Sequence, residues 1–263
     1  MTAELQAERR DATLILTISN PAQRNTLSPQ VFDAGIEALN VAESDSTLRC
    51  VILTGADRQF CAGGDLRRLA ANRHATADTG LAEQTRAVER FHDWIEALHT
   101  FQKPVIAAVE GAAAGGGFSL ALACDLLVAA DSARFSMAYT RVGLSPDGGS
   151  SWHLMQALPR ALVLRLLWLA EPLTARELHL HGLAYQVCGD GEALQTALKL
   201  AERLAALPAQ AVASIKELVN QYPTPGLRAQ LDRERDQFVE NLMGPDAGEG
   251  LQAFFDKREP RFG

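Results

Sequence analysis

The pattern of hydrophobic and polar positions along this 263-residue chain predicts alternating strands and helices, followed by helices alone. Short apolar runs bounded by Gly, Asp or Asn are typical of strands that are buried on both faces. Such runs predict strands at 14–19, 50–54, 105–109, 125–129, 134–136 and 185–188. The other patterned stretches predict helices at 29–42, 66–72, 83–99, 118–123, 152–158, 161–169, 174–181, 192–206, 209–220, 227–241 and 247–256.

This order of elements predicts an α/β fold with a helical end. We expect residues 1–190 to form the core and residues 191–263 to form a helical C-terminal region, because the predicted strands stop at 188. No linker rich in Pro, Gly or Ser divides the chain. Residues 73–84 are polar and rich in Ala and Thr, so we expect a mobile segment there.

Two glycine-rich loops repeat one design, in which a strand leads through glycines into a helix. The first is GADRQFCAGGD at 55–65, and the second spans 111–117 and ends in three glycines. The first N–H groups of a helix have no partner within it, and glycine lets the backbone turn sharply and approach a ligand. Either loop could therefore bind an anion, or an oxygen atom that becomes one.

Other interpretations of the second loop remain open. A tight connection packed against a neighbour would need no ligand. A P-loop is excluded because no Gly-Lys-Ser/Thr follows, and the spacing does not fit the dinucleotide-binding fingerprint. GFSLA at 117–121 comes close to the G-x-S-x-G motif of serine hydrolases, with Ser119 as nucleophile. That alternative would need Asp147 and one of three histidines as partners, namely His153, His179 or His181.

The amino-acid composition restricts which kinds of molecule the protein can have as partners. The hydrophobic content of 47% and the charged content of 22% are ordinary for a globular protein. A net charge of −7 argues against nucleic acid as the main partner. The four cysteines are far apart, with no C-x-x-C spacing and no nearby His to complete a metal site. No apolar stretch is typical of a signal peptide or a membrane span, so we expect a cytoplasmic protein without a membrane partner.

FCAGGDL at 60–66 together with PVIAAVEGAAAGGGFSLALACD at 104–125 resembles the crotonase, or enoyl-CoA hydratase/isomerase, family. The similarity continues through ADSARFSMAYTRVGLSPDGGSSW at 130–152 and TARELHLHGLAYQV at 174–187 to GLQAFFDKREPRF at 250–262. Within the family, GLSPDGGSSW and LDRERDQF at 231–238 are most similar to the double-bond and ring-opening isomerases of phenylacetate-type degradation.

The resemblance implies a fold and a substrate class. The fold would be a spiral of β-β-α units with a helical trimerisation region, so the protein would form a homotrimer or a dimer of trimers. The substrate would be an acyl-CoA thioester, whose carbonyl oxygen accepts hydrogen bonds from the backbone N–H groups of Gly64 and Gly116. It implies no metal or redox cofactor, since CoA belongs to the substrate.

The catalytic positions of the family are only partly retained. Hydratases use two glutamates to activate water, and these positions are Ser119 and Tyr139 here. Neither is a carboxylate, so we expect little hydration and expect both residues to line the acyl pocket. Asp147 matches the aspartate with which isomerases move a proton, although Pro-Asp-Gly also occurs in ordinary turns. His92 matches the histidine base of a related dehalogenase.

The resemblance also implies contacts with CoA. Arg24 would meet the phosphates, and Ala62, Asp65 and Leu66 would lie along the adenine and pantetheine. Phe254 and Lys257 would reach CoA from a neighbouring subunit.

The sequence thus favours an enoyl-CoA isomerase that uses Asp147 as its base. Two alternatives keep the same scaffold. One is an enoyl-CoA hydratase, and the other is an enzyme that uses Asp147 and His92 for hydrolysis of, or substitution on, an acyl-CoA. A serine hydrolase that uses Ser119, or a non-catalytic protein that binds acyl-CoA or RNA, are alternatives of other classes.

Overall fold

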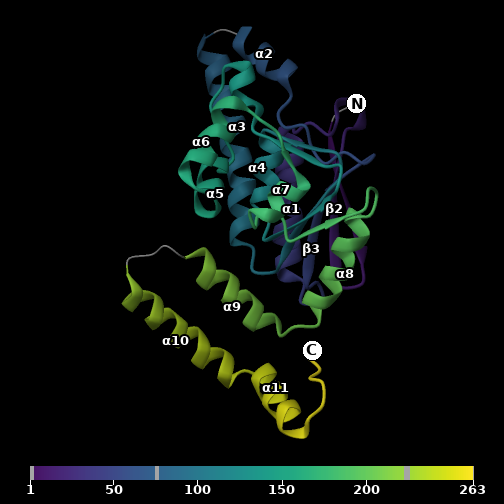
Figure 1. The fold of residues 1–263 in the computed structure, drawn as a ribbon, viewed down its shortest axis with the longest axis vertical. Helices are drawn as coiled ribbons and strands as arrows, with labels where there is room; N and C mark the ends of the chain where they lie inside the picture. Colours follow the sequence, from purple (N-terminus) through teal and green to yellow (C-terminus); the bar gives the residue numbers. More distant parts are fainter. Residues whose placement is uncertain (1–2, 75–76, 222–225, 263) are drawn as a thin grey trace.

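A computed structural model describes residues 3–74, 77–221 and 226–262, and its centre is a six-stranded sheet (Figure 1). The strands lie in the order β1-β2-β3-β4-β6-β9. Only β1 and β2 are antiparallel, and every other pair is parallel. The strands are β1 (Glu4–Arg10), β2 (Thr13–Ser19), β3 (Cys50–Gly55), β4 (Val105–Val109), β6 (Leu126–Ala130) and β9 (Gln186–Cys188).

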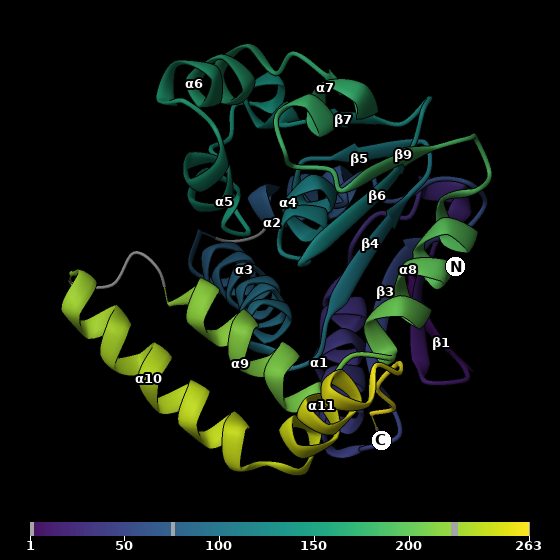
Figure 2. The ribbon, with the colours of Figure 1, turned by 60° about the horizontal axis from the view of Figure 1, so that its bottom comes forward.

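Helices cover both faces of this sheet (Figure 2). Val51 and Leu53 of β3 belong to the core that also holds side chains of α1 (Pro29–Ser44) and α3 (Ala77–Thr100). Cys50 and Ile52 point to the other face, where α8 (Ala193–Ala205) packs. Because successive side chains of a strand point to opposite faces, a strand covered on both sides must be apolar throughout. This explains the continuous apolar run of β3.

A smaller sheet stands beside the first. It consists of β5 (Ala112–Ala114), β7 (Arg134–Ser136) and β8 (Leu173–Thr174) in the order β5-β7-β8. β5 lies inside the second glycine-rich loop, where the sequence predicts only a turn. Further helices are α2 (Leu66–His74), α4 (Gly116–Leu122), α5 (Ser150–Ala157), α6 (Arg160–Leu169) and α7 (Ala175–Leu180), with short 3-10 turns at Pro21–Gln23 and Ala138–Val142.

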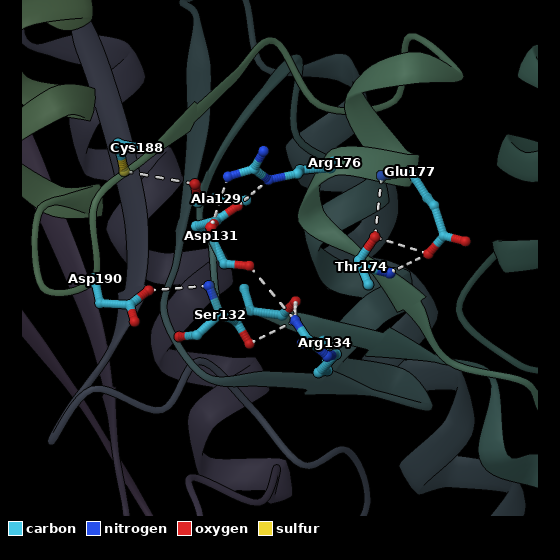
Figure 3. Close-up of polar contacts among 10 residues, drawn as sticks. Ala129, Asp131, Ser132, Arg134, Thr174, Arg176, Glu177, Cys188 and Asp190 are labelled. Carbon is cyan, nitrogen blue, oxygen red and sulfur yellow. Dashed lines mark hydrogen bonds and ion pairs between the residues drawn. The ribbon is translucent and has the colours of Figure 1, made fainter.

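A polar cluster joins the segments that follow β6 and β9 to α7 (Figure 3). The carboxylate of Asp131 accepts two hydrogen bonds from Arg176, at 2.6 Å to Oδ1 and 2.9 Å to Oδ2. The backbone N–H of Ser132 donates to Asp190 Oδ1 over 2.9 Å. Both contacts lie at the surface, where solvent screening leaves them little effect on stability. Their effect is to fix the course of the chain between the two sheets.

The C-terminal helices α9 (Ala209–Asn220), α10 (Leu227–Met243) and α11 (Pro245–Asp256) extend away from the sheet (Figure 2). α9 is fastened to the end of α3, since Asn220 Nδ2 donates to His99 O over 2.7 Å. α10 runs beside α9, and Ser214 Oγ donates to Gln237 Oε1 over 2.7 Å. Several large apolar side chains of this region are exposed, among them Leu227, Phe238, Met243, Phe254 and Phe255.

The α/β fold with a helical C-terminal region is confirmed, and besides β5 several details differ from the sequence prediction. Residues 73–74 end α2 and residues 77–84 begin α3, so these residues, where we expected a mobile segment, are helical; residues 75 and 76 lie outside the described ones. α8 lies in the stretch expected to form the separate helical region, but it packs on the central sheet. β1 was not predicted, because its sequence ELQAERR is largely polar and its strand is largely exposed.

Candidate active site

The two glycine-rich loops lie side by side. Cys61 N donates to Ala112 O and Ala114 N donates to Cys61 O, each over 2.9 Å. These bonds form a parallel bridge between the first loop and β5. The first loop is also held from the α1 side, where Leu27 N donates to Gly63 O over 2.8 Å. Separate stretches of sequence therefore meet at the start of α4.

Gly63 allows this close approach. Its φ of +89° lies in the region that favours glycine. A Cβ atom there would lie 2.6 Å from Ala114 O and 3.2 Å from Gly116 N. Among the described residues, neither Gly64 N nor Gly116 N donates a hydrogen bond. Space is open at Gly64, where a Cβ would meet no atom within 4 Å. Two unpartnered N–H groups in neighbouring loops can hold an oxygen on which charge develops.

Ser119, Tyr139 and Asp147 form one hydrogen-bonded cluster next to these loops. Tyr139 Oη donates to Asp147 Oδ1 over 2.6 Å. Ser119 Oγ, in the first turns of α4, lies 3.2 Å from Tyr139 Oη and donates to Asp147 O over 3.0 Å. It also lies 3.3 Å from Gly115 O. The structure thus brings together the three residues that sequence analysis selected from separate motifs.

The protonation of the cluster follows from its burial. Tyr139 is only 8% exposed and Ser119 is fully buried, whereas Asp147 is half-buried. Burial, and next the negative charge of Asp147, raise the pKa of Tyr139 far above its usual range. The phenol is therefore protonated at neutral pH and donates its hydrogen to the aspartate.

Gly148 and Phe91 complete this region, and sequence analysis missed both. Gly148 has a φ of +61°, and a Cβ there would lie 2.4 Å from Phe91 Cε1 and 2.9 Å from Ser119 Cβ. Only glycine lets Asp147 come so close to α4. Phe91 is buried, and its ring also faces Gly116. Nothing local in the sequence distinguishes Phe91 from other apolar residues of α3, whereas the two glycines after Asp147 were a usable signal.

The structure does not bring His92 into the hydrogen-bonded cluster. Its side chain is exposed, while the neighbouring Phe91 faces the site. Within the described residues, no hydrogen bond or ion pair joins His92 to Asp147 or Tyr139. Neighbouring side chains on a helix point about 100° apart. Because the ring of Phe91 packs against the site, the side chain of His92 points elsewhere.

The serine hydrolase interpretation is also not supported. In the part of the chain that the structure describes, no histidine forms a hydrogen bond with Ser119. His179 Nδ1 lies 3.0 Å from Ala184 O instead, and His153 packs against the ring of His99. His181 forms no bond to the cluster either. A serine nucleophile needs a base within hydrogen-bond reach, so Ser119 is better explained as a structural hydroxyl.

The residues expected to contact CoA fall into two groups. Arg24 is exposed beside the first loop, and its carbonyl oxygen accepts from Ala62 N over 3.0 Å. Asp65 caps α2 by accepting from Arg67 N, and Leu66 is exposed. Phe254 and Lys257 are exposed at the far end of the chain, on and just after α11, away from α4 of the same chain (Figure 1). The structure therefore brings the first group, but not the second, to the loops.

Residues 3–74, 77–221 and 226–262 contain no group of three or more His, Cys, Asp or Glu side chains that could hold a metal ion. In the same ranges, no helix combines the length and the apolar character needed to cross a membrane.

A family model for enoyl-CoA hydratase/isomerase matches residues 8–263. The chain belongs to this family. The enoyl-CoA hydratase/isomerase family acts on acyl-CoA substrates, so the two adjoining glycine-rich loops lie in an acyl-CoA enzyme. The similarity spans nearly the whole chain, which agrees with the order of motifs along the sequence.

Individual members of the family differ in their reactions. The chain is 40% identical to the 1,2-epoxyphenylacetyl-CoA isomerase of Escherichia coli K12 over 253 residues, covering 95% of this chain and 94% of that protein. It is 32% identical to the 2,3-dehydroadipyl-CoA hydratase of the same organism over 260 residues, covering 99% and 98%. A crystal structure of an enoyl-CoA hydratase from Polaromonas sp. JS666 superposes with a TM-score of 0.95 at 50% identity, covering 98% and 99%. Family membership alone therefore leaves isomerase and hydratase as alternatives.

Proposed function

We propose that the protein is an enoyl-CoA isomerase that shifts a double bond by proton transfer through Asp147. The observation that carries the proposal is the Ser119–Tyr139–Asp147 cluster, in which a single carboxylate stands beside two loops with unpartnered N–H groups. The 40% identity to a 1,2-epoxyphenylacetyl-CoA isomerase supports an isomerase more than a hydratase.

In the proposed reaction, the carboxylate of Asp147 removes a proton from C2 of a 3-enoyl-CoA. The resulting charge moves to the thioester oxygen, which accepts hydrogen bonds from Gly64 N and Gly116 N. The same carboxyl group then returns the proton to C4, and the double bond lies between C2 and C3. Each such backbone donor is worth about 2.7–4 kcal/mol where one has been removed in other enzymes.

The cluster disfavours hydration. Addition of water requires a group that accepts a proton from water and a group that donates one. Ser119 and Tyr139 are uncharged hydroxyls that each donate to Asp147, so neither can serve as a carboxylate base. One carboxylate is enough for a proton shift between two carbons.

The proposal includes the binding of CoA and the assembly of subunits. Arg24, Ala62, Asp65 and Leu66 would hold CoA from the same chain. Phe254 and Lys257 would reach it from a neighbour, because they lie far from the loops of their own chain. The exposed apolar side chains of α10 and α11 would be covered in a homotrimer or a dimer of trimers. The reaction moves only a proton, so it needs no metal or redox cofactor, and a cytoplasmic location fits these substrates.

The test compares the wild type with Asp147→Asn on a 3-enoyl-CoA and a 2-enoyl-CoA, with isomer and hydrate separated by chromatography. Isomerisation should fall by about 10²–10⁴-fold in the variant, the usual contribution of a positioned proton-transfer group. The wild type should form little hydrate. Asp11→Asn, an exposed residue of the β1–β2 turn, is the matched control.

Strong hydration that survives in Asp147→Asn would overturn the proposal and make the hydratase the better assignment. Release of free CoA that depends on Asp147 would favour hydrolysis instead.

A further inference from the structure

The two oxygens of the Asp147 carboxylate have different surroundings. Oδ1 accepts a hydrogen bond from Tyr139 Oη over 2.6 Å, a short distance that is typical of a hydroxyl bonded to a carboxylate. Among the described residues, no donor contacts Oδ2. The backbone carbonyl of Asp147 accepts separately from Ser119 Oγ. The carboxyl group is therefore held through one oxygen and open at the other.

Tyr139 is itself fixed in place. It is buried, and it belongs to the 3-10 turn Ala138–Val142, whose backbone is held by a hydrogen bond from Leu144 N to Tyr139 O over 3.0 Å. Its hydroxyl lies 3.2 Å from Ser119 Oγ, which is anchored on α4. The three residues close a ring of contacts, since Ser119 reaches both the phenol and the backbone of Asp147.

We propose that Tyr139 is a positioning residue for Asp147. Its hydroxyl locks the carboxyl group so that Oδ2 alone carries the substrate proton, and Ser119 holds this arrangement from α4. The inference rests on the proposed isomerase reaction and adds to it which atom moves the proton and why that proton does not reach water.

The step balances without a further reactant. The C2–H bond of the substrate breaks, its hydrogen forms an O–H bond with Oδ2, and the electron pair passes to the thioester oxygen. The O–H bond then breaks, its hydrogen forms the C4–H bond, and the electron pair of the dienolate returns to carbon. Nothing is oxidised or reduced. Asp147 ends as the carboxylate that it was at the start.

The hydroxyl of Tyr139 matters during the interval between the two steps. Without it, the protonated carboxyl group can turn about its Cβ–Cγ bond and exchange Oδ1 with Oδ2. The displaced proton then returns to C4 more slowly, and at the half-buried Asp147 it has longer to exchange with solvent. A misplacement of about 1 Å in a reacting group can cost on the order of 10²-fold in rate, so both the speed and the origin of the transferred proton should change.

The experiment is isomerisation of a 3-enoyl-CoA in D₂O by the wild type and by Tyr139→Phe, with product collected at low conversion. Mass spectrometry gives its deuterium content, and initial rates give kcat and KM. We expect kcat to fall by about 10- to 100-fold, and KM to change by less than about twofold because binding is unchanged. The deuterium content should rise several-fold. Tyr185→Phe, whose exposed hydroxyl contacts Arg203, is the matched control and should behave like the wild type.

A folded Tyr139→Phe with unchanged kcat and unchanged deuterium content would overturn the inference and leave the proposed function intact. A wild type without isomerase activity would overturn both. If Tyr139→Phe does not fold, Ser119→Ala replaces it, because the alanine removes the contact that holds the phenol. A raised deuterium content in Ser119→Ala supports the inference, and an unchanged one overturns it.

Discussion

Lys216 Nζ lies 2.8 Å from Asp125 Oδ2, and this ion pair fastens α9 to the central sheet. The side chain of Lys216 is only 10% exposed. Its ammonium group also donates to Leu98 O over 3.3 Å and to Lys103 O over 3.4 Å. Asp125 Oδ2 accepts in addition from Val105 N, at the first residue of β4. Burial raises the pKa of Asp125, and the charge of Lys216 opposes that shift.

Lys216→Met should destabilise the fold. The substitution removes the counter-charge of Asp125, whose side chain is 26% exposed, and leaves the carbonyls of Leu98 and Lys103 without their donor. Loss of a hydrogen bond to a charged group costs about 1.5–3 kcal/mol. The free energy of unfolding in urea measures the loss. Lys199→Met on the exposed side of α8 is the control and should change stability by less than about 0.5 kcal/mol. A similar decrease in the free energy of unfolding in both variants would show that the ion pair does not contribute to stability.

Gly148→Ala should reduce both stability and activity. Its Cβ would collide with the ring of Phe91 and with Ser119, and overpacking of this kind costs about 1–3 kcal/mol. Gly182→Ala separates this effect from backbone strain, because Gly182 also has a positive φ, +75°, but its Cβ would meet no atom within 4 Å. Thermal unfolding and isomerase assays of both variants check the prediction. Equal effects would mean that strain alone explains the glycine.

Gly63→Ala should separate the two loops. A Cβ at this position would meet Ala114 O at 2.6 Å and Gly116 N at 3.2 Å, so the chain must shift where the two proposed oxyanion donors meet. Loss of one such donor corresponds to about 10²–10³-fold in kcat. Steady-state kinetics on an enoyl-CoA measures the decrease in kcat. Gly248→Ala, which has free space for a Cβ, should leave the rate unchanged; a fully active Gly63→Ala would contradict the proposed donors.

The stability of the protein should fall in mild acid because of His153. Burial, and next the charge of His99, lower the pKa of His153 from 6.5 to about 4. The unfolded chain therefore binds a proton at this residue more readily than the folded chain, so stability falls as the pH drops from 6.5 toward about 4 and is fully retained above 6.5. His153→Gln should flatten this part of the stability profile, measured by urea unfolding at several pH values. Parallel profiles for the two proteins would exclude the contribution.

Local signals and the family resemblance selected most residues of the candidate site. Both glycine-rich loops were visible because a strand, a glycine cluster and a helix follow one another directly along the chain. Asp147 was selected because it matches the aspartate of the family's isomerases, although its Pro-Asp-Gly setting also occurs in ordinary turns. Features of this kind involve neighbours in sequence, and therefore need no knowledge of packing.

Features that depend on distant contacts were not predicted. β5 forms because it pairs with β7, at residues 134–136 further along the chain, and its three alanines give no strand signal of their own. The sequence selected His92 and gave no signal for its neighbour Phe91, whose ring packs against Gly116 and Gly148. The bond from Tyr139 to Asp147 joins two loop positions eight residues apart. Only the folded structure establishes these contacts.

The meeting of the two loops has a consequence for how such enzymes diverge. The proposed oxyanion donors belong to the main chain, so substitutions of pocket side chains leave them in place as long as Gly63 is retained. The side chains at positions 119, 139 and 147 can then be substituted together, and each combination would direct the activated thioester to a different reaction. The main chain thus fixes how the thioester is activated, and a few side chains determine which reaction follows.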